Sequence, residues 1–172
     1  RPETMLGDTA VAVNPSDERY KSLVNKNVIV PIVDRKIKII EDDYADPEQG
    51  TGAVKITPAH DFNDYEVGER NNLEIINVFT PDGKINENAP DNYIGLDRFE
   101  ARKRILKELS DKDLLVKEEK IKNKVPYGDR SNSIIEPYLT EQWFADAKKL
   151  SIKAKEIVNN KTTNFFPVNW TK

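Results

Sequence analysis

Short runs of apolar and β-branched residues, separated by polar turns, fill the first half of the chain. Such runs are typical of strands, because their side chains pack well on a pleated sheet. The pattern predicts strands within 9–13, 27–33, 36–40, 53–56 and 74–80. Asp34-Arg35 separates the second run from the third, and Pro81-Asp82-Gly83 follows the last, so hairpin turns are expected at both places. A further strand with flanking charges is expected within 113–124.

Apolar residues at helical spacing predict the remaining elements. The clearest helix is expected over 96–109, with a shared apolar face made of Leu96, Phe99, Leu106 and Leu109. A second amphipathic helix is expected over 145–158. Capping residues predict two more helices: Ser16 begins a short one toward Leu23, and Asp61 begins one that runs over 62–69.

These elements indicate an α+β, β-rich fold with a distorted β-barrel core and flanking helices. At 172 residues with 37% hydrophobic content, the chain is expected to form one domain over 1–172. The tail at 164–170 is too apolar for a free terminus and is expected to dock on this domain or on a neighbour. Because the chain starts at Arg1 and its one methionine is Met5, we expect it to be a piece of a longer polypeptide.

Composition narrows the possible chemistry. The chain has no cysteine, which excludes disulfides, thiolate nucleophiles and Cys-ligated zinc, and its single histidine leaves no room for a multi-histidine metal site. With 27 Lys and Arg against 30 Asp and Glu, the net charge of -3 argues against nucleic-acid binding through a broad basic surface. It does not exclude binding of one short end of a nucleic-acid strand. No apolar stretch has the length of a membrane span or a signal sequence, so a cytoplasmic protein without a membrane partner is expected.

The segment 50–68, GTGAVKITPAHDFNDYEVG, concentrates the candidate chemistry. An apolar run carries Lys55, a Pro-Ala turn follows, and then come His60, Asp61 and Asp64. A strand that ends in a polar turn and opens a helix is a favourable place for a site, because amides at the helix start attract anions and loop side chains are free to face a ligand. The alternative interpretation is structural: Asp61 only caps the helix, Lys55 faces solvent and His60 closes the turn.

Three blocks carry a resemblance to a known family. RPETMLGDTAVAVNP at 1–15, the segment at 50–68, and RSNSIIEPYLTEQWF at 130–144 together resemble the editing insert of valyl-tRNA synthetase, in family order and over nearly the whole chain. The leucyl insert resembles TRPDTLFG with AVPAHD instead, and the isoleucyl insert has a tryptophan in the first block and a glycine after the histidine. The residues that side with the valyl family are Glu3, Met5, Lys55, Ile56, Thr57 and Asp61. The family's HIGH and KMSKS nucleotide-binding signatures are absent from this sequence.

The resemblance implies a deacylase that removes threonine from mischarged tRNA(Val), with the adenylate as a second candidate substrate, within a parent enzyme that attaches valine with ATP. Threonine and valine have nearly the same shape, and the valyl enzyme itself is the known example of a pocket that rejects the extra hydroxyl by only about a hundredfold. An editing site must therefore offer a hydrogen-bond acceptor that only threonine satisfies. Asp61 is the candidate acceptor, and Asp64 is expected to pair with the α-ammonium of the ester.

The remaining site residues surround these two carboxylates. Lys55 is expected to place positive charge near the reacting carbonyl or phosphate, and Thr57 to line the pocket. By resemblance, the opening segment contacts the terminal adenosine and crowds the amino acid, with Thr4 limiting side-chain size; its site residues are Arg1, Glu3 and Thr4. The role of His60 stays open between turn formation and catalysis. Oriented water is expected to suffice, without a metal, a cofactor or a covalent intermediate, and ATP is expected to serve only the parent enzyme's catalytic domain.

The resemblance also implies binding partners, and three alternative functions stand beside it. The resemblance implies the threonine-carrying acceptor end of tRNA(Val) and the rest of the synthetase chain as partners, with 130–172 including the linker back to the catalytic domain and the isolated domain a monomer. The alternatives are a non-catalytic module that binds the acceptor end, the editing insert of a leucyl or isoleucyl enzyme, and an unrelated glycan hydrolase with a carboxylate pair. The family's two threonines before Arg1 are not in this sequence, which leaves the activity of the isolated chain open.

Overall fold

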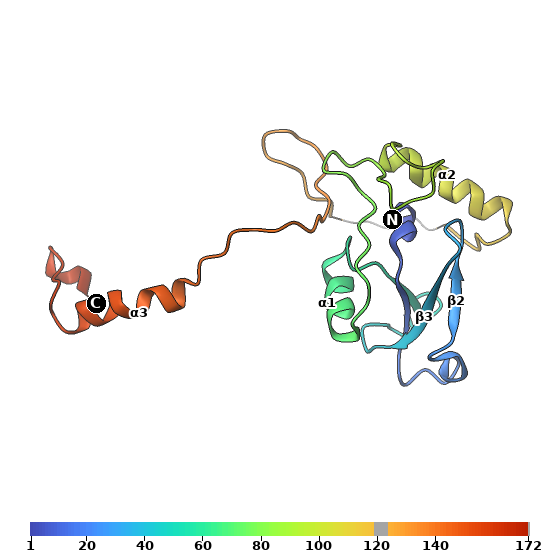
Figure 1. The fold of residues 1–172 in the computed structure, drawn as a ribbon. Helices are drawn as coiled ribbons and strands as arrows, with labels where there is room; N and C mark the ends of the chain where they lie inside the picture. The colour runs from blue at the N-terminus through green and yellow to red at the C-terminus, as the bar shows by residue number, and fades with distance from the viewer. Residues whose placement is uncertain (119–123, 172) are drawn as a thin grey trace. The chain divides into compact units, whose positions relative to one another are not determined.

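The computed structural model describes residues 1–118 and 124–171 of the chain, which divides into two compact units at 1–139 and 140–172 (Figure 1). The first unit contains the strands and the first two α-helices, and the second contains the third. The division falls within 130–172, the range in which a linker is expected. Whether 1–172 acts as one domain stays a prediction.

A four-stranded mixed sheet with the order β2-β3-β1-β4 forms the base of the first unit. Its strands are β1 (Ala10–Val13), β2 (Asn27–Val30), β3 (Arg35–Glu41) and β4 (Ala53–Ile56). β2 and β3 form an antiparallel hairpin, β1 runs parallel to β3, and β4 returns antiparallel to β1. Ala10 pairs with Ile56 in this last ladder, so the residues just before β1 lie beside those just after β4.

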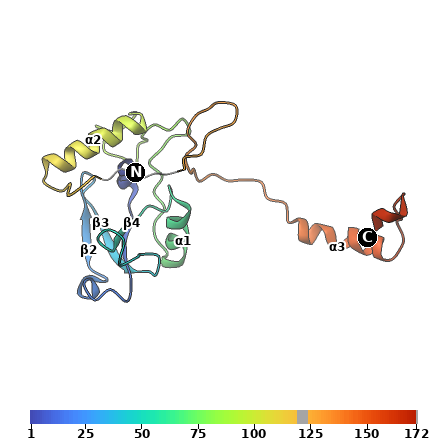
Figure 2. The ribbon, with the colours of Figure 1, turned by 180° about the vertical axis from the view of Figure 1, so that it is seen from behind.

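Helices pack around this sheet. The elements are the 3₁₀-helices η1 (Pro2–Gly7) and η2 (Lys21–Leu23), then α1 (Phe62–Asn71) and α2 (Arg98–Asp111). α1 contacts β4, and α2 packs against η1, so that both views show α2 close to the N-terminus and α1 beside the sheet (Figure 2). None of the helices in the described ranges is long and apolar enough to cross a bilayer.

Two apolar clusters hold the unit together. One joins η1 to α2 and centres on Leu6, Phe79 and Ile105; the other joins the sheet to α1 through Ala12, Ile56 and Val67. η1 packs in the first cluster, and the end of β4 packs in the second. The predicted site residues on η1 and those on or after β4 are therefore held in place by two different apolar clusters.

The predicted α+β class is confirmed, but the β-rich barrel is not found. In the described part of the chain the strands form one open sheet, and each α-helix is longer than any strand. The expected strand at 74–80 contributes only an isolated bridge from Phe79 to Ile85 around the predicted Pro-Asp-Gly turn. Side chains take its backbone donors instead: Val78 N donates to His60 Nε2, and Phe79 N donates to Asn77 Oδ1. A segment bonded in this way cannot extend the sheet.

Other elements differ in detail from the sequence pattern. The short helix expected from Ser16 is a series of turns ending in η2, because Asp17 Oδ1 accepts from the amide of Arg19 and competes with helical bonding. The apolar face of α2 is centred on Ala101 and Ile105, which are fully buried, whereas Leu106 lies at its margin. Within the predicted strand at 113–124, residues 114–118 and 124 have no regular structure, and 119–123 lie outside the described residues.

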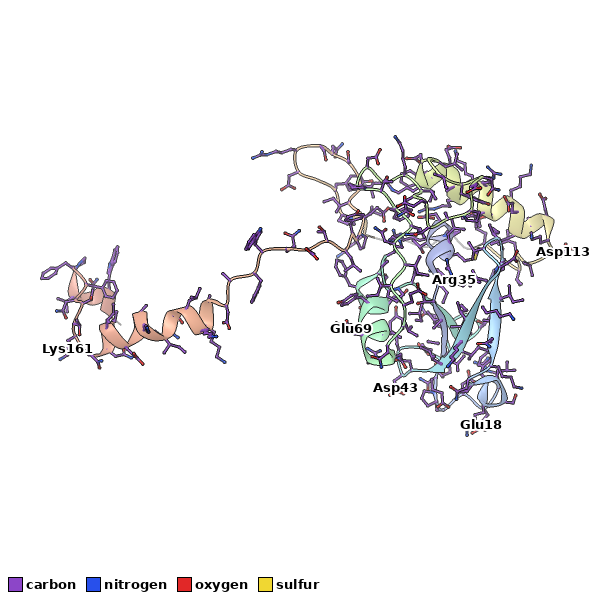
Figure 3. The ribbon with its side chains drawn as sticks, viewed as in Figure 1. Glu18, Arg35, Asp43, Glu69, Asp113 and Lys161 are labelled. Carbon is purple, nitrogen blue, oxygen red and sulfur yellow. The ribbon has the colours of Figure 1, made fainter. Side chains whose placement is uncertain are left out.

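The second unit contains α3 (Ala147–Asn159), capped by Asp146, and the 3₁₀-helix η3 (Val168–Thr171). The predicted amphipathic helix is confirmed, but it buries no residue within the chain (Figure 3). Large apolar side chains stay exposed before and after α3, including Trp143, Phe166 and Trp170. That the apolar tail docks on this domain or on a neighbour stays a prediction.

Candidate functional site

A pocket of about 250 Å³ gathers most of the predicted site residues at the junction of η1, β4 and α1. Its lining consists of Arg1, Thr4, Tyr44, Val54, Lys55, Thr57, His60, Asp61 and Asp64. Every predicted site residue except Glu3 therefore lies on one pocket. Tyr44 and Val54 line it without having been predicted as site residues.

Local geometry brings the turn residues to the pocket. β4 ends at Ile56, and the His60 amide donates to the Thr57 carbonyl at 3.0 Å, which closes a tight turn before the helix. Asp61 then caps α1, as predicted: its Oδ1 accepts from Asn63 N at 2.9 Å and from Asp64 N at 3.2 Å. A Cβ on Gly68 would lie 2.8 Å from Pro58 Cγ, so glycine is needed where α1 crosses the turn.

The Lys55 ammonium lies within a cluster of oxygen atoms at one side of the pocket. It donates to Thr4 Oγ1 at 3.0 Å, to Asp8 Oδ1 at 3.2 Å and to Thr57 Oγ1. Thr57 donates its own hydroxyl to Asp8, and Thr4 donates to the Arg1 carbonyl at 2.9 Å. Because an ammonium has three N–H donors, these three oxygens use all of them. The lysine therefore organises the two pocket threonines.

Asp64 supplies the buried carboxylate of the pocket. Only 6% of the residue is exposed, and its Oδ2 accepts from the Thr57 amide at 2.8 Å, which ties α1 to the end of β4. Burial raises the pKa of Asp64, with the nearby Asp61 charge adding to it, while the Thr57 amide and Lys55 oppose the shift. Tyr44 interacts with the same carboxylate through its side chain. A carboxylate in such a position attracts a cation that fits the pocket.

His60 is a structural acceptor in this arrangement. Its Nε2 accepts from the Val78 amide at 2.9 Å, and its ring lies 4.6 Å from that of Phe79, centroid to centroid. Burial, followed by the charges of Arg1 and Lys55, lowers the pKa of His60 to about 4. The neutral ring therefore links the turn before α1 to the segment at 78–79, which favours turn formation over acid-base catalysis.

A pH titration of stability tests this assignment. Because the folded pKa of His60 is about 4 and the ordinary value 6.5, the unfolded chain binds the proton first as the pH falls. His60 therefore contributes stability that is complete above about pH 6.5 and is lost down to about pH 4. Between about pH 7.5 and pH 5, we expect its share of the free energy of unfolding to fall by about 2 kcal/mol.

His60→Gln is the matched variant, because a glutamine oxygen can accept from the Val78 amide without titrating. Urea unfolding of both chains at the two pH values should show a loss in the original chain that exceeds the loss in the variant by this amount. The carboxylates titrate in both chains and cancel in the comparison. Equal losses would show that His60 is not held in its neutral form.

Glu3 does not line the pocket, and its expected contact with substrate stays a prediction. Its side chain is fully buried and accepts two bonds from Arg102 of α2, from Nε at 2.7 Å and from Nη2 at 2.6 Å. Burial alone would raise the pKa of Glu3, but the bonds and charge of Arg102 outweigh it and lower the pKa. Glu3 thus anchors η1 on α2.

Arg1 connects this anchor to the pocket. Its Nη1 donates to the His60 carbonyl at 2.7 Å, its Nε lies 3.8 Å from Glu3 Oε1, and it forms an ion pair with Glu136. Glu136 also accepts from Arg98 Nε at 3.0 Å. The third sequence block, at 130–144, therefore reaches the site through Glu136.

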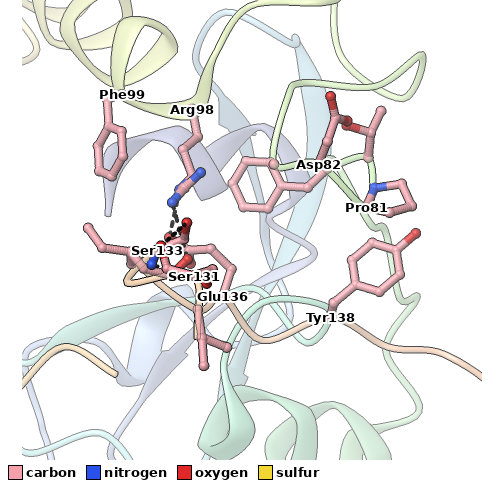
Figure 4. A pocket seen from close by; sticks show the side chains of 13 residues that line it. Pro81, Asp82, Arg98, Phe99, Ser131, Ser133, Glu136 and Tyr138 are labelled. Carbon is pink, nitrogen blue, oxygen red and sulfur yellow. Dashed lines mark hydrogen bonds and ion pairs between the residues drawn. The ribbon is translucent and has the colours of Figure 1, made fainter. Parts of the chain in front are cut away.

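A larger pocket of about 650 Å³ lies next to this network, between the turn at 80–83, the start of α2 and residues 131–138. Figure 4 shows Arg98 pointing toward Glu136 across it, with Phe99 and Tyr138 at opposite sides. Its central charges are already paired with each other, and none of the predicted site residues lines it. The smaller pocket is therefore the candidate site despite its size.

Sequence reasoning missed two pocket-lining residues, Tyr44 and Val54, and the buried carboxylate of Asp8, which lies behind the lining. Asp8 is 3% exposed and contacts Thr57 because β1 and β4 are paired, a relation that no local pattern reveals. A carboxylate directly before an apolar strand was the one available signal for it. Within the described ranges no group of three or more potential metal-ligating side chains is found, and the absence of a metal requirement stays a prediction.

Comparisons with known proteins agree on the kind of domain. Residues 8–95 match the family model described as leucyl-tRNA synthetase, editing domain. The chain is 80% identical to the valine–tRNA ligase of Pelagibacter ubique (strain HTCC1062) over 100% of its own length and 20% of that protein. It is 56% identical to the valine–tRNA ligase of Caulobacter vibrioides (100% of this chain, 19% of the relative) and 53% identical to that of Dechloromonas aromatica (99% and 19%). The chain thus spans about a fifth of the length of these curated relatives.

Proposed function

This chain belongs to the family of aminoacyl-tRNA synthetase editing domains, and from this premise we propose that it hydrolyses threonine from mischarged tRNA(Val). The predicted resemblance to the editing insert of the valyl enzyme is confirmed by the family match and by relatives that are valine–tRNA ligases. We further propose that the parent enzyme attaches valine to tRNA(Val) with ATP at a site outside this chain.

The distribution of free hydrogen-bonding groups in the pocket carries the proposal. Thr4 and Thr57 each donate their one hydroxyl hydrogen and accept a bond from Lys55, so neither has a hydrogen left to donate to a substrate. The anionic acceptors that line the pocket are the carboxylates of Asp61 and Asp64, at the start of α1. Two acceptors suit a small amino acid with two donors, an α-ammonium and a side-chain hydroxyl.

Each carboxylate has a distinct role in this proposal. Asp64, the more buried, pairs with the α-ammonium and so fixes the ester carbonyl. Asp61 Oδ1 caps α1, and its second oxygen accepts from the threonine hydroxyl, whereas valine would cover that oxygen without giving it a partner. Lys55 adds positive charge beside the developing oxyanion, and the wall of Thr4 and Thr57 limits side-chain size.

The chemistry is ester hydrolysis by an oriented water. Water attacks the acyl carbonyl, the bond to the ribose oxygen breaks, and a proton returns to that oxygen, which releases threonine and an intact tRNA. The α-ammonium already activates the ester, so the proposal requires no metal, cofactor or protein nucleophile. Threonyl-adenylate is a possible second substrate because it presents the same amino acid.

The partners follow from the substrate. We propose that the acceptor end of tRNA(Val) enters the pocket, that the rest of the synthetase delivers it in the cytoplasm, and that the isolated chain is a monomer. Arg1 is positioned to meet the terminal nucleotide, because its guanidinium lies at the pocket and about a third of its side chain is exposed to solvent.

Deacylation assays test the proposal directly. Threonyl-tRNA(Val) and valyl-tRNA(Val) would be incubated with the chain, with a version extended by the two family threonines before Arg1, and with a full-length ligase that contains the chain. Selective release of threonine is expected. Equal release of both amino acids would contradict the specificity, and binding of the acceptor end without release by any of the three proteins would establish the non-catalytic alternative.

A further inference from the structure

We propose that Asp8 is a positioning residue of the editing site, acting through Lys55 and Thr57. The inference rests on the proposed function for its kinetic consequence, but its structural part stands by itself. Asp8 does not line the pocket; it lies behind the wall, in the turn between η1 and β1. Its carboxylate is the one negative charge within bonding distance of the Lys55 ammonium in the part of the chain that the structure describes.

Burial makes this carboxylate costly unless it is paired. The Asp8 side chain is 4% exposed, and its Oδ1 accepts both from Lys55 and from the Thr57 hydroxyl. A buried carboxylate with two donors holds both of them in place, because moving either one leaves charge uncompensated. Two pocket residues are therefore fixed by one atom that the substrate never touches.

The direction of the hydroxyl bonds gives Asp8 its effect on recognition. Because the Thr57 hydroxyl donates its hydrogen bond to Asp8, its oxygen faces Lys55 as an acceptor. The third N–H of Lys55 then donates to Thr4. Without the Asp8 charge, the Thr57 proton is free to turn into the pocket and to bond Asp61, Asp64 or the substrate. Asp8 thereby keeps the two carboxylates of α1 available.

The backbone around Asp8 supports such a role. Arg35 Nη1 of β3 donates to the carbonyls of Leu6 at 2.9 Å and of Asp8 at 3.2 Å, and the neighbouring Thr9 amide donates to the Ile56 carbonyl at 3.0 Å. Asp8 is thus tied to both strands that flank β1, and its side chain has a fixed starting point.

The test combines a chemical and a kinetic measurement on Asp8→Asn, which keeps the shape and removes the charge. Reductive methylation of Lys55, followed by mass spectrometry of peptides, reports how firmly the amine is held, with the exposed Lys36 as internal reference. We expect the methylation rate of Lys55 relative to Lys36 to rise about fivefold in the variant, because its ionic acceptor is lost. Asp17→Asn is the control, since Asp17 is a similarly buried carboxylate that pairs with Arg19 away from the pocket.

The kinetic arm uses a double-mutant cycle with Lys55→Met. Asp8→Asn should lower kcat for threonyl-tRNA(Val) deacylation by about tenfold through misplacement of the pocket wall, with a smaller change in KM. Because Asp8 acts partly through Lys55, the loss in the double variant should be clearly smaller than the product of the two single losses. Should Asp8→Asn fail to fold, Asp8→Glu keeps the charge but displaces the carboxylate from its two donors, leaves the Lys55 bonds to Thr4 and Thr57 in place, and should also raise Lys55 methylation.

The two proposals fail in distinguishable ways. An unchanged Lys55 methylation rate, or strictly additive losses in the cycle, would overturn the role of Asp8. Absence of deacylation by the unsubstituted chain and by the full-length ligase would overturn the editing function, while the methylation arm would still decide whether Asp8 holds Lys55.

Discussion

Replacement of Asp64 by asparagine is expected to reduce kcat/KM for threonyl-tRNA(Val) deacylation by about a thousandfold. The carboxylate is nearly buried, so an α-ammonium bound there has little access to water and loses its counter-charge in the variant. Loss of one partner of a buried charge pair costs about 2–5 kcal/mol, and about 4 kcal/mol corresponds to a thousandfold. Asparagine retains an oxygen for the Thr57 amide, which keeps the link between α1 and β4.

The measurement is single-turnover deacylation over a range of enzyme concentrations, which separates binding from chemistry. Asp43→Asn is the matched control, because Asp43 is an exposed carboxylate outside the pocket and its loss changes the net charge by the same amount. Since burial raises the pKa of Asp64, activity of the unsubstituted chain should fall as the pH is lowered through that pKa, and the variant should lack this dependence. An asparagine variant with undiminished activity would show that the ammonium is bound elsewhere.

Most of the site was predictable because it is local in sequence. Lys55, Thr57, His60, Asp61 and Asp64 lie on one strand, one turn and the first turn of one helix, and each of these elements has its own sequence signal. An Asp before a helical run predicts both the cap and the start of α1. Once strand and helix are located, the side chains at their junction must lie together.

Residues that depend on long-range pairing were not predictable in the same way. Asp8 reaches Thr57 only through the ladder of β1 and β4, and Glu3 meets a partner in Arg102 that is 99 positions away. Glu3 was therefore assigned to substrate contact because it lies in a site-like motif, whereas its side chain is buried and binds Arg102. The spacing of apolar and polar residues does not predict that Glu3 pairs with an arginine or that Asp8 pairs with a lysine far away in the sequence.

The barrel was overestimated for a related reason. Apolar and β-branched residues at 74–80 satisfy the pattern of a strand, but their backbone donors bond to His60 and Asn77, which the pattern does not count. The parallel pairing of β1 with β3 is likewise a tertiary outcome, since the hairpin of β2 and β3 folds back before β3 meets β1. Local propensity located these segments without fixing their neighbours.

Replacement of Asp61 by serine is expected to reduce the preference for threonyl over valyl ester by about a hundredfold. A hydrogen bond to a charged group contributes about 1.5–3 kcal/mol, and about 2.7 kcal/mol corresponds to this factor. Serine is as good an N-cap as aspartate, but its single oxygen is needed for the amides of Asn63 and Asp64, which Asp61 Oδ1 now binds. The variant therefore keeps the start of α1 and loses the additional acceptor. The measurement is the ratio of kcat/KM for the two esters.

Asp61→Ala separates the two possible roles of this residue. Alanine removes both the cap and the acceptor, and loss of the cap costs about 1 kcal/mol of stability. If Asp61 recognises the hydroxyl, serine and alanine should reduce the threonine preference alike, with only alanine lowering the free energy of unfolding. If serine retains the full preference and alanine loses it, Asp61 is a cap and nothing more, and the hydroxyl must be recognised by Asp64 or by the main chain. A gain in valine release without any loss of threonine release would also contradict the proposed acceptor, because that result would show exclusion of valine rather than recognition of threonine.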